Sequence, residues 1–188
     1  MAITGADVTI SKDRVKEVLK TIRDLTNKRV LVGIPESADE RPEGEAGNAL
    51  IGYVQENGCP ELNIPPRPFL VPGVKNATEE STRILKRAGV AALRGDGSEV
   101  DNRLNQVGLM CAASVKDKMD TGPFKPLADS TLEARVRKGG GSQVGAKEEL
   151  ESRREGNPPG TDLAQPLIDT GNLQNSITYV IRDMRDKH

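Results

Sequence analysis

The sequence predicts a single α+β domain spanning residues 1–188. Apolar residues recur every three or four positions in several stretches, as they do on one face of a helix. Two short runs, 29–34 and 177–181, are rich in valine and isoleucine, which is typical of strands. The length is that of one ordinary domain. We therefore expect a small, mostly antiparallel sheet packed against two longer helices. A long loop of Gly, Pro and charged residues should precede the last helix and strand.

The N-terminal part begins with an amphipathic helix that Ser11 can cap. Residues 29–34 follow as a short buried strand, which Pro35 ends, and residues 36–47 form an acidic loop. Residues 48–57 are expected to form a short helix that ends at Gly58. Residues 64–72 contain closely spaced prolines, which favour an extended segment. The apolar positions on the two helices are Val15, Val18, Leu19, Ile22 and Leu25, then Ala49, Leu50, Tyr53 and Val54.

The middle of the chain contains the two longer helices, over 74–95 and 100–119, because both stretches keep one apolar face. A short helix is expected over 129–137. Residues 139–165 contain mostly Gly, Pro, Glu, Arg and Lys, so we interpret them as a flexible insertion within the domain. Asp169 or Thr170 then caps a short helical turn before the last strand, 177–181.

Composition excludes several classes of function. Lys and Arg number 27 against 28 Asp and Glu, and a net charge of −1 gives no general attraction to nucleic acid. The one histidine, His188, is the last residue, which argues against histidine catalysis. Cys59 and Cys111 are too few for a zinc site, and we expect free thiols. We expect no cofactor, no metal and no membrane partner. No secretory signal is visible, so the protein should stay in the cytosol where it is made.

One motif suggests an enzyme. Asp-Thr-Gly occurs at 120–122 and again at 169–171, and aspartic proteases use two such loops whose carboxylates share a proton. The alternative is that both copies are turns, because Asp, Thr and Gly are common turn residues. Only residues 170–188 follow Asp169, which is too little chain to support a catalytic loop. A protease using Asp120 and Asp169 is therefore a distant alternative. It predicts that Asp169→Asn abolishes peptide cleavage.

A third hypothesis is a cytosolic nucleic-acid-binding adaptor. Six basic residues between 135 and 154 could contact phosphate groups, but four glutamates are interleaved with them. Such contact would be weak and sensitive to salt.

Three segments, taken in order, carry a family resemblance. Residues 51–58 (IGYVQENG) lead into 64–72 (IPPRPFLVP). Residues 126–132 read PLADSTL, and residues 166–177 read PLIDTGNLQNSI. In this order they resemble the tail-completion, or neck, proteins of long-tailed bacteriophages, often labelled virion morphogenesis proteins. That family shows Glu-x-Gly, Arg-Pro-Phe-Leu, Leu-x-x-x-Thr and a closing Pro-Leu-x-Asp-Thr-Gly-x-Leu-x-x-Ser-Ile. The resemblance covers roughly residues 48–181 and departs from the pattern between 139 and 160.

The resemblance implies a structural virion protein rather than an enzyme. It implies a role at the head–tail junction, with assembly in the host cytoplasm and a cyclic homo-oligomer whose expected size is a hexamer. Its other partners would be neighbouring neck proteins: the head-completion or connector protein, the tail terminator and the tail tube. DNA would pass through the ring without specific binding. The runner-up within this class is a tail terminator that caps the tail tube.

The resemblance also assigns two structural motifs as candidate interface residues. In the first, Arg67, Pro68 and Phe69 form a rigid extended segment, and Leu70 follows it. Phe69 would insert into the core or into a subunit seam, and Arg67 would stay free to pair with an acid. In the second, Asp169, Thr170 and Gly171 form a structural turn whose Asp or Thr side chain accepts backbone N–H groups.

Overall fold

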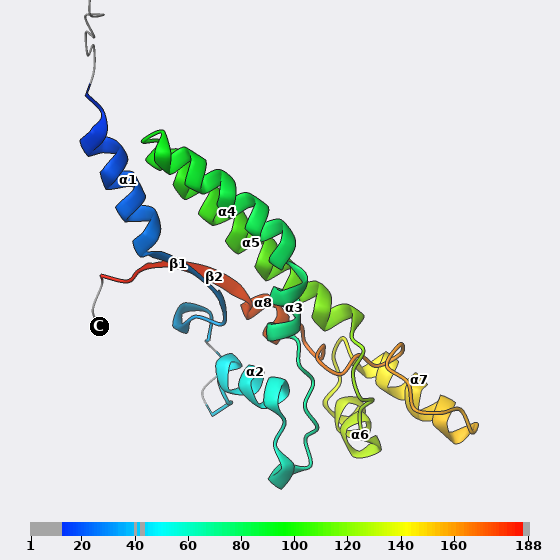
Figure 1. The fold of residues 1–188 in the computed structure, drawn as a ribbon. Coiled ribbons are helices and arrows are strands. Elements are labelled where there is room, and N and C mark those ends of the chain that lie inside the picture. Colours follow the sequence, from blue (N-terminus) through cyan, green and yellow to red (C-terminus); the bar gives the residue numbers. More distant parts are fainter. Residues whose placement is uncertain (1–12, 40, 42–43, 186–188) are drawn as a thin grey trace, which may run out of the picture.

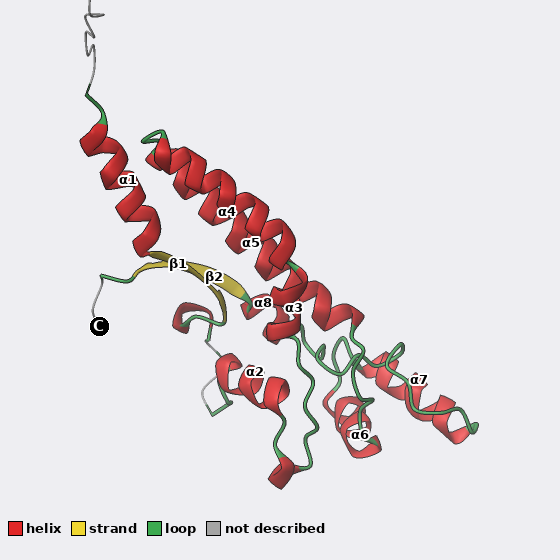
Figure 2. Cartoon of the chain, in the orientation of Figure 1, coloured by secondary structure: helices red, strands yellow, loops and turns green. Residues whose placement is uncertain are grey.

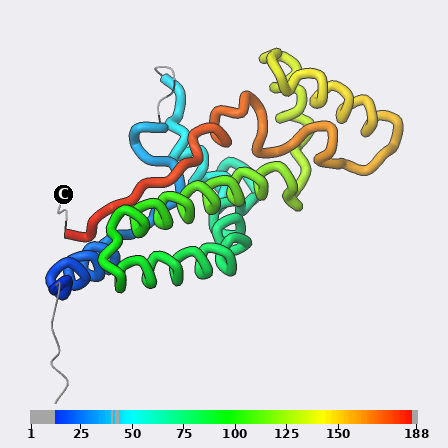
Figure 3. The backbone as a smooth tube through the Cα atoms, turned by 90° about the horizontal axis from the view of Figure 1, so that it is seen from above, coloured from blue at the N-terminus to red at the C-terminus, as the bar shows by residue number. Residues whose placement is uncertain are grey.

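A computed structural model describes residues 13–39, 41 and 44–185. Over these residues the chain forms eight α-helices, two 3₁₀ turns and two strands (Figures 1 and 2), which agrees with the α+β class. The proposed cap Ser11 and part of the acidic loop lie outside the described residues. Seen from above, the long helices run along the molecule, with α1 at one end and α6 and α7 at the other (Figure 3).

The longest helices are α4 (Thr78–Leu93) and α5 (Gly97–Thr121), which pack side by side (Figures 1 and 3). The Asp96 carboxylate begins α5 by accepting the backbone N–H of Glu99 at 3.0 Å. Helix α1 (Val15–Asn27) packs against α4. The predicted apolar face of α5 is confirmed, and its buried members include Val100, Leu104, Val107, Cys111 and Val115.

The sheet has two antiparallel strands, β1 (Lys28–Gly33) and β2 (Thr178–Asp183), with Val30 opposite Ile181. Val30 contacts buried residues of α4 and α5. The prediction of a buried first strand is only half right, because Leu31 on the opposite face is 44% exposed. Gly108 lets β2 approach α5 closely, since a Cβ at this position would lie 2.1 Å from the Tyr179 ring.

The 74–95 helix and the extended 64–72 segment both need correction. Helix α3 (Leu70–Asn76) begins inside the segment predicted to be extended, and Ala77 separates it from α4. Pro72 is accommodated because it stands in the first turn, where backbone N–H groups have no intrahelical acceptor. Gly73 brings α3 against α5, since its added Cβ would lie 2.6 Å from the Val115 Cα.

The expected short helix is α2 (Asn48–Asn57), but its predicted buried face is wrong. Leu50 is 58% exposed and Tyr53 is 68% exposed, whereas Asn48 and Gly52 are buried. Gly52 is buried next to Ile34, and a Cβ at this position would lie only 3.0 Å from the Ile34 side chain. Tertiary packing therefore overrides the local apolar spacing in this helix.

The prediction of a long loop over 139–165 is wrong in its first half. Helix α6 (Asp129–Lys138) is followed by α7 (Gln143–Arg154), and the two pack against each other. Their shared core centres on Leu132 and Ala146, both fully buried, with Leu127 and Ala164 beside them. The contact between α6 and α7 needs few large apolar residues because the small side chain of Ala146 lies at its centre. The buried carboxylate of Glu149 is paired with Arg153 at 2.8 Å. The short helix α8 (Asn172–Ser176) then leads into β2.

Candidate functional site

The three motif segments converge on one cleft of about 1170 Å³. One wall comes from α2 and the strap, defined here as residues 64–69. The opposite wall comes from α6 and from residues 166–173, while residues 125–131 connect the two walls. Segments separated by dozens of residues in sequence thus meet at a single surface feature. We take this cleft as the candidate functional site.

Phe69 lies in the core of its own chain. It is 1% exposed and belongs to a cluster with Val115, Met119, Leu167 and Ile177. The sequence left two possible positions for this ring, the core or a subunit seam. The structure places it in the core. Leu70 packs against the same cluster as the first residue of α3, and Pro68 is exposed.

Glu56 holds the strap to α2, a role that sequence reasoning missed. Its carboxylate accepts the backbone N–H groups of Phe69, Leu70 and Val71 at 2.7, 2.8 and 3.1 Å. These groups lie at the start of α3, where a helix leaves its N–H groups without backbone acceptors. The glutamate of the Glu-x-Gly motif therefore caps the helix that follows Arg-Pro-Phe. The sequence signal that could have indicated this role is the occurrence of Glu-x-Gly shortly before Arg-Pro-Phe-Leu.

Arg67 is buried and pairs with no acid among the described residues, so the expectation that it is free to pair with an acid stays a prediction. It is 5% exposed. Its Nε donates to the Lys125 carbonyl at 3.2 Å and its Nη1 donates to the Gln55 side-chain oxygen at 3.2 Å. Burial lowers the pKa of Arg67, and the nearby Arg135 cation lowers this pKa further. Neutral acceptors hold the guanidinium in place without neutralising it.

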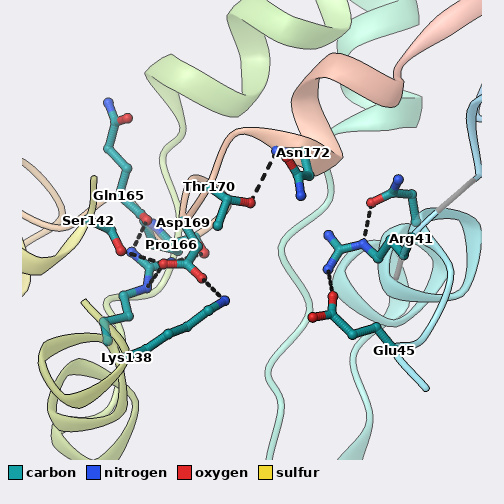
Figure 4. Close-up of polar contacts among 11 residues, drawn as sticks. Arg41, Glu45, Lys138, Ser142, Gln165, Pro166, Asp169, Thr170 and Asn172 are labelled. Atoms are coloured by element: carbon teal, nitrogen blue, oxygen red, sulfur yellow. Dashed lines mark hydrogen bonds and ion pairs between the residues drawn. The ribbon is translucent and has the colours of Figure 1, made fainter. Parts of the chain in front are cut away.

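Asp169 joins the last turn to the α6–α7 pair (Figure 4). Its carboxylate accepts hydrogen bonds from the Ser142 hydroxyl and from Lys138, at 3.2 Å for Lys138, and the Arg135 guanidinium lies 3.7 Å away. Burial alone would raise the pKa of Asp169. The Ser142 hydrogen bond and the two cations outweigh burial and lower this pKa below its usual value. Asp169 is therefore an ionised tether between elements rather than a helix cap.

Within this turn the Thr170 hydroxyl accepts the Asn172 backbone N–H at 3.4 Å (Figure 4), although no side chain caps α8. Gly171 occupies the left-handed region at φ 78° directly before α8, which explains glycine at the third motif position. A turn at 169–171 therefore forms, although its aspartate has a different role from the one predicted.

The two Asp-Thr-Gly copies lie in different surroundings. Asp120 is in the last turn of α5, and its carboxylate accepts from the Gln174 amide at 2.8 Å. Asp169 is surrounded by Ser142 and cations instead. Each carboxylate thus has its own partners. Among the described residues, no group of three or more His, Cys, Asp or Glu side chains could hold a metal ion. Within the same residues, none of the helices has the length and apolar character needed to cross a membrane.

Basic residues dominate the cleft, which composition did not indicate. Asp129 and Asp169 are its only acidic lining residues over the described chain. Arg135 is nearly as buried as Arg67, at 7% exposed, and donates to the carbonyls of Gln165 and Pro166 at 2.9 and 3.1 Å. The basic side chains that line the cleft are Arg41, Arg67, Lys125, Arg135, Lys138 and Arg153.

Comparisons with protein families, with curated proteins and with solved structures find no match to this chain.

Proposed function

We propose that this protein is a structural component of the head–tail neck of a tailed bacteriophage. It acts in tail completion and forms a ring around the DNA channel. The observation that carries the proposal is the occurrence, in order, of the segments around 51–72, 126–132 and 166–177. The three segments line one cleft, so each has a physical reason to occur with the others.

The contacts within the motifs support a structural role for them. Glu56 caps α3, Phe69 fills the core, and Asp169 joins the last turn to α6 and α7. These residues fix the arrangement of helices and strands within one subunit. The sheet and the paired helices α4 and α5 would then form the rigid frame of that subunit, and surfaces outside this frame would contact neighbouring subunits.

The second candidate is a tail terminator that caps the tail tube. The two functions differ in what their loss does to the particle. Loss of a completion protein leaves filled heads beside detached tails of normal length, whereas loss of a terminator allows the tube to grow too long.

The test is electron microscopy of lysates from the phage that encodes the chain, with this gene inactivated. A plasmid copy of the gene serves as the control and should restore infectious particles. We expect filled heads and free tails of normal length. Overlong tubes would replace the proposal by the terminator, and normal infectious particles without the plasmid would refute both.

A further inference from the structure

The cleft contains two cationic side chains that the described chain leaves without an acidic partner. Arg41 pairs with Glu45, Arg135 and Lys138 pair with Asp169, and Arg153 pairs with Asp129 and Glu149. Each of these cations has an acidic partner, although Arg135 and Lys138 share Asp169. The exceptions are Arg67 and Lys125.

These two exceptions are neighbours. The Arg67 Nε donates to the backbone carbonyl of Lys125, so both residues lie at the point where the strap meets the 125–131 segment. The Nη2 group of Arg67 makes no hydrogen bond with the described residues, and it is not fully buried. Arg67 nevertheless lines the cleft, so this group remains available to a ligand there. The exposed side chain of Lys125 thus gives the cleft one cation at its surface, and the buried guanidinium of Arg67 gives it a second cation at greater depth.

A buried cation without a counter-ion is unfavourable, and a second buried cation close to it makes the arrangement less favourable still. Arg67 is 95% buried and is repelled by Arg135 from the facing wall. An oxyanion in the cleft would pair with the Arg67 guanidinium by charge-assisted hydrogen bonds and reduce this repulsion. The arrangement is therefore poised for an anionic group that the described residues do not supply.

The burial of Arg67 limits the class of ligand that can reach it. The phosphates of a nucleic-acid duplex lie on the outside of a wide, stiff rod and cannot reach a guanidinium that is 5% exposed. A single Asp or Glu side chain can enter. A cleft of about 1170 Å³ also has room for the peptide that carries it.

We propose that the cleft binds an acidic segment of a protein partner, with one carboxylate on Arg67 and a second on Lys125. The interaction surface is the strap together with residues 125–131. It does not depend on the phage role proposed above, because binding can be measured with the isolated chain.

The test uses fluorescein-labelled hexaglutamate and measures fluorescence polarisation at low ionic strength. We expect saturable binding, with affinity about tenfold weaker in Arg67→Gln and in Lys125→Gln, as for loss of one charge-assisted contact. Lys20→Gln on α1, which also removes one lysine charge, should bind within about twofold of the wild type. Since Arg67 is buried, its variant must first show the wild-type circular dichroism spectrum. Lys125 is exposed, so its variant tests the cleft even if Arg67→Gln does not fold.

Two competitors identify the ligand. Inorganic phosphate and a short DNA duplex are each compared with sodium chloride at the same ionic strength. Displacement no stronger than that by chloride supports a carboxylate peptide site. Displacement of hexaglutamate by phosphate or by the duplex at lower concentration than chloride would overturn the choice of partner. Equal affinity of the wild type, Arg67→Gln and Lys125→Gln would overturn the site itself.

Discussion

The carboxylate of Glu56 accepts the backbone N–H of Phe69 at 2.7 Å, and this contact joins the end of α2 to the start of α3. The same carboxylate also accepts the next two backbone N–H groups. A side chain thirteen residues earlier in the chain thus does the work that a local cap residue does in most helices. The contact fixes the position at which Phe69 enters the core.

Removal of this cap should destabilise the protein. We expect Glu56→Ala to lower the free energy of unfolding by about 1–3 kcal/mol, because three backbone donors lose their acceptor. Urea denaturation followed by circular dichroism measures the loss. Glu61→Ala is the control, since Glu61 is exposed in the turn Pro60–Leu62. Equal stability of the two variants would show that the cap contributes nothing.

Two glycines in helix interiors should respond to alanine with opposite signs. Gly89 has open space at its Cβ position, so Gly89→Ala should stabilise the protein by about 0.5–1 kcal/mol through helix propensity. At Gly108 the added methyl group would overlap the Tyr179 ring, so Gly108→Ala should destabilise and displace β2. Thermal unfolding of both variants checks the signs. A rise in melting temperature for Gly108→Ala would contradict the close approach of β2 to α5.

Asp169 should make stability depend on acid pH. Its pKa is lowered in the folded protein, so its contribution is complete above the unfolded pKa of about 3.9. That contribution is lost as the pH falls from there through the lower folded pKa. In urea unfolding at pH 6 and pH 3, wild type should therefore lose more stability than Asp169→Asn does. Asp117→Asn, at an exposed site on α5, serves as the control and should behave as wild type. A wild-type pH dependence in Asp169→Asn would rule out this tether.

The two cysteines should differ in reactivity. Cys111 is 5% exposed, and burial raises the pKa of its thiol, although a hydrogen bond with Ser81 opposes the change. Cys59 is partly exposed. Because the thiolate is the reactive form, iodoacetamide should label Cys59 rapidly in the native protein and Cys111 only after unfolding. Mass spectrometry of the peptides measures both rates. In Cys59→Ser, rapid native labelling would show that Cys111 is accessible.

The sequence predicted those elements whose burial follows a regular period. Helix α5 was recognisable because Val100, Leu104, Val107 and Cys111 repeat at helical spacing and are all buried. Helix α7 was missed because burial and apolarity disagree there. Val144 is 64% exposed, whereas the buried positions are Ala146 and Glu149.

The cleft was beyond sequence reasoning for a related reason. The strap and the 169–171 turn were identified as motifs, but the surroundings of Arg67 depend on residues from distant segments, such as Gln55 and Lys125. Charge counting gave no indication of the cleft, since the whole chain is nearly neutral. A local concentration of cations appears only once the fold brings those segments together.

Pairing β1 with β2 also sets an order for folding during synthesis. The strand at Lys28–Gly33 leaves the ribosome well before its partner at Thr178–Asp183, with nearly all of the helices made in between. At about 5–20 residues per second, this interval lasts on the order of ten seconds. Throughout it, β1 presents unpaired backbone groups to any other nascent chain nearby. The sheet can therefore form only after β2 has been made, later than nearly all of the helices.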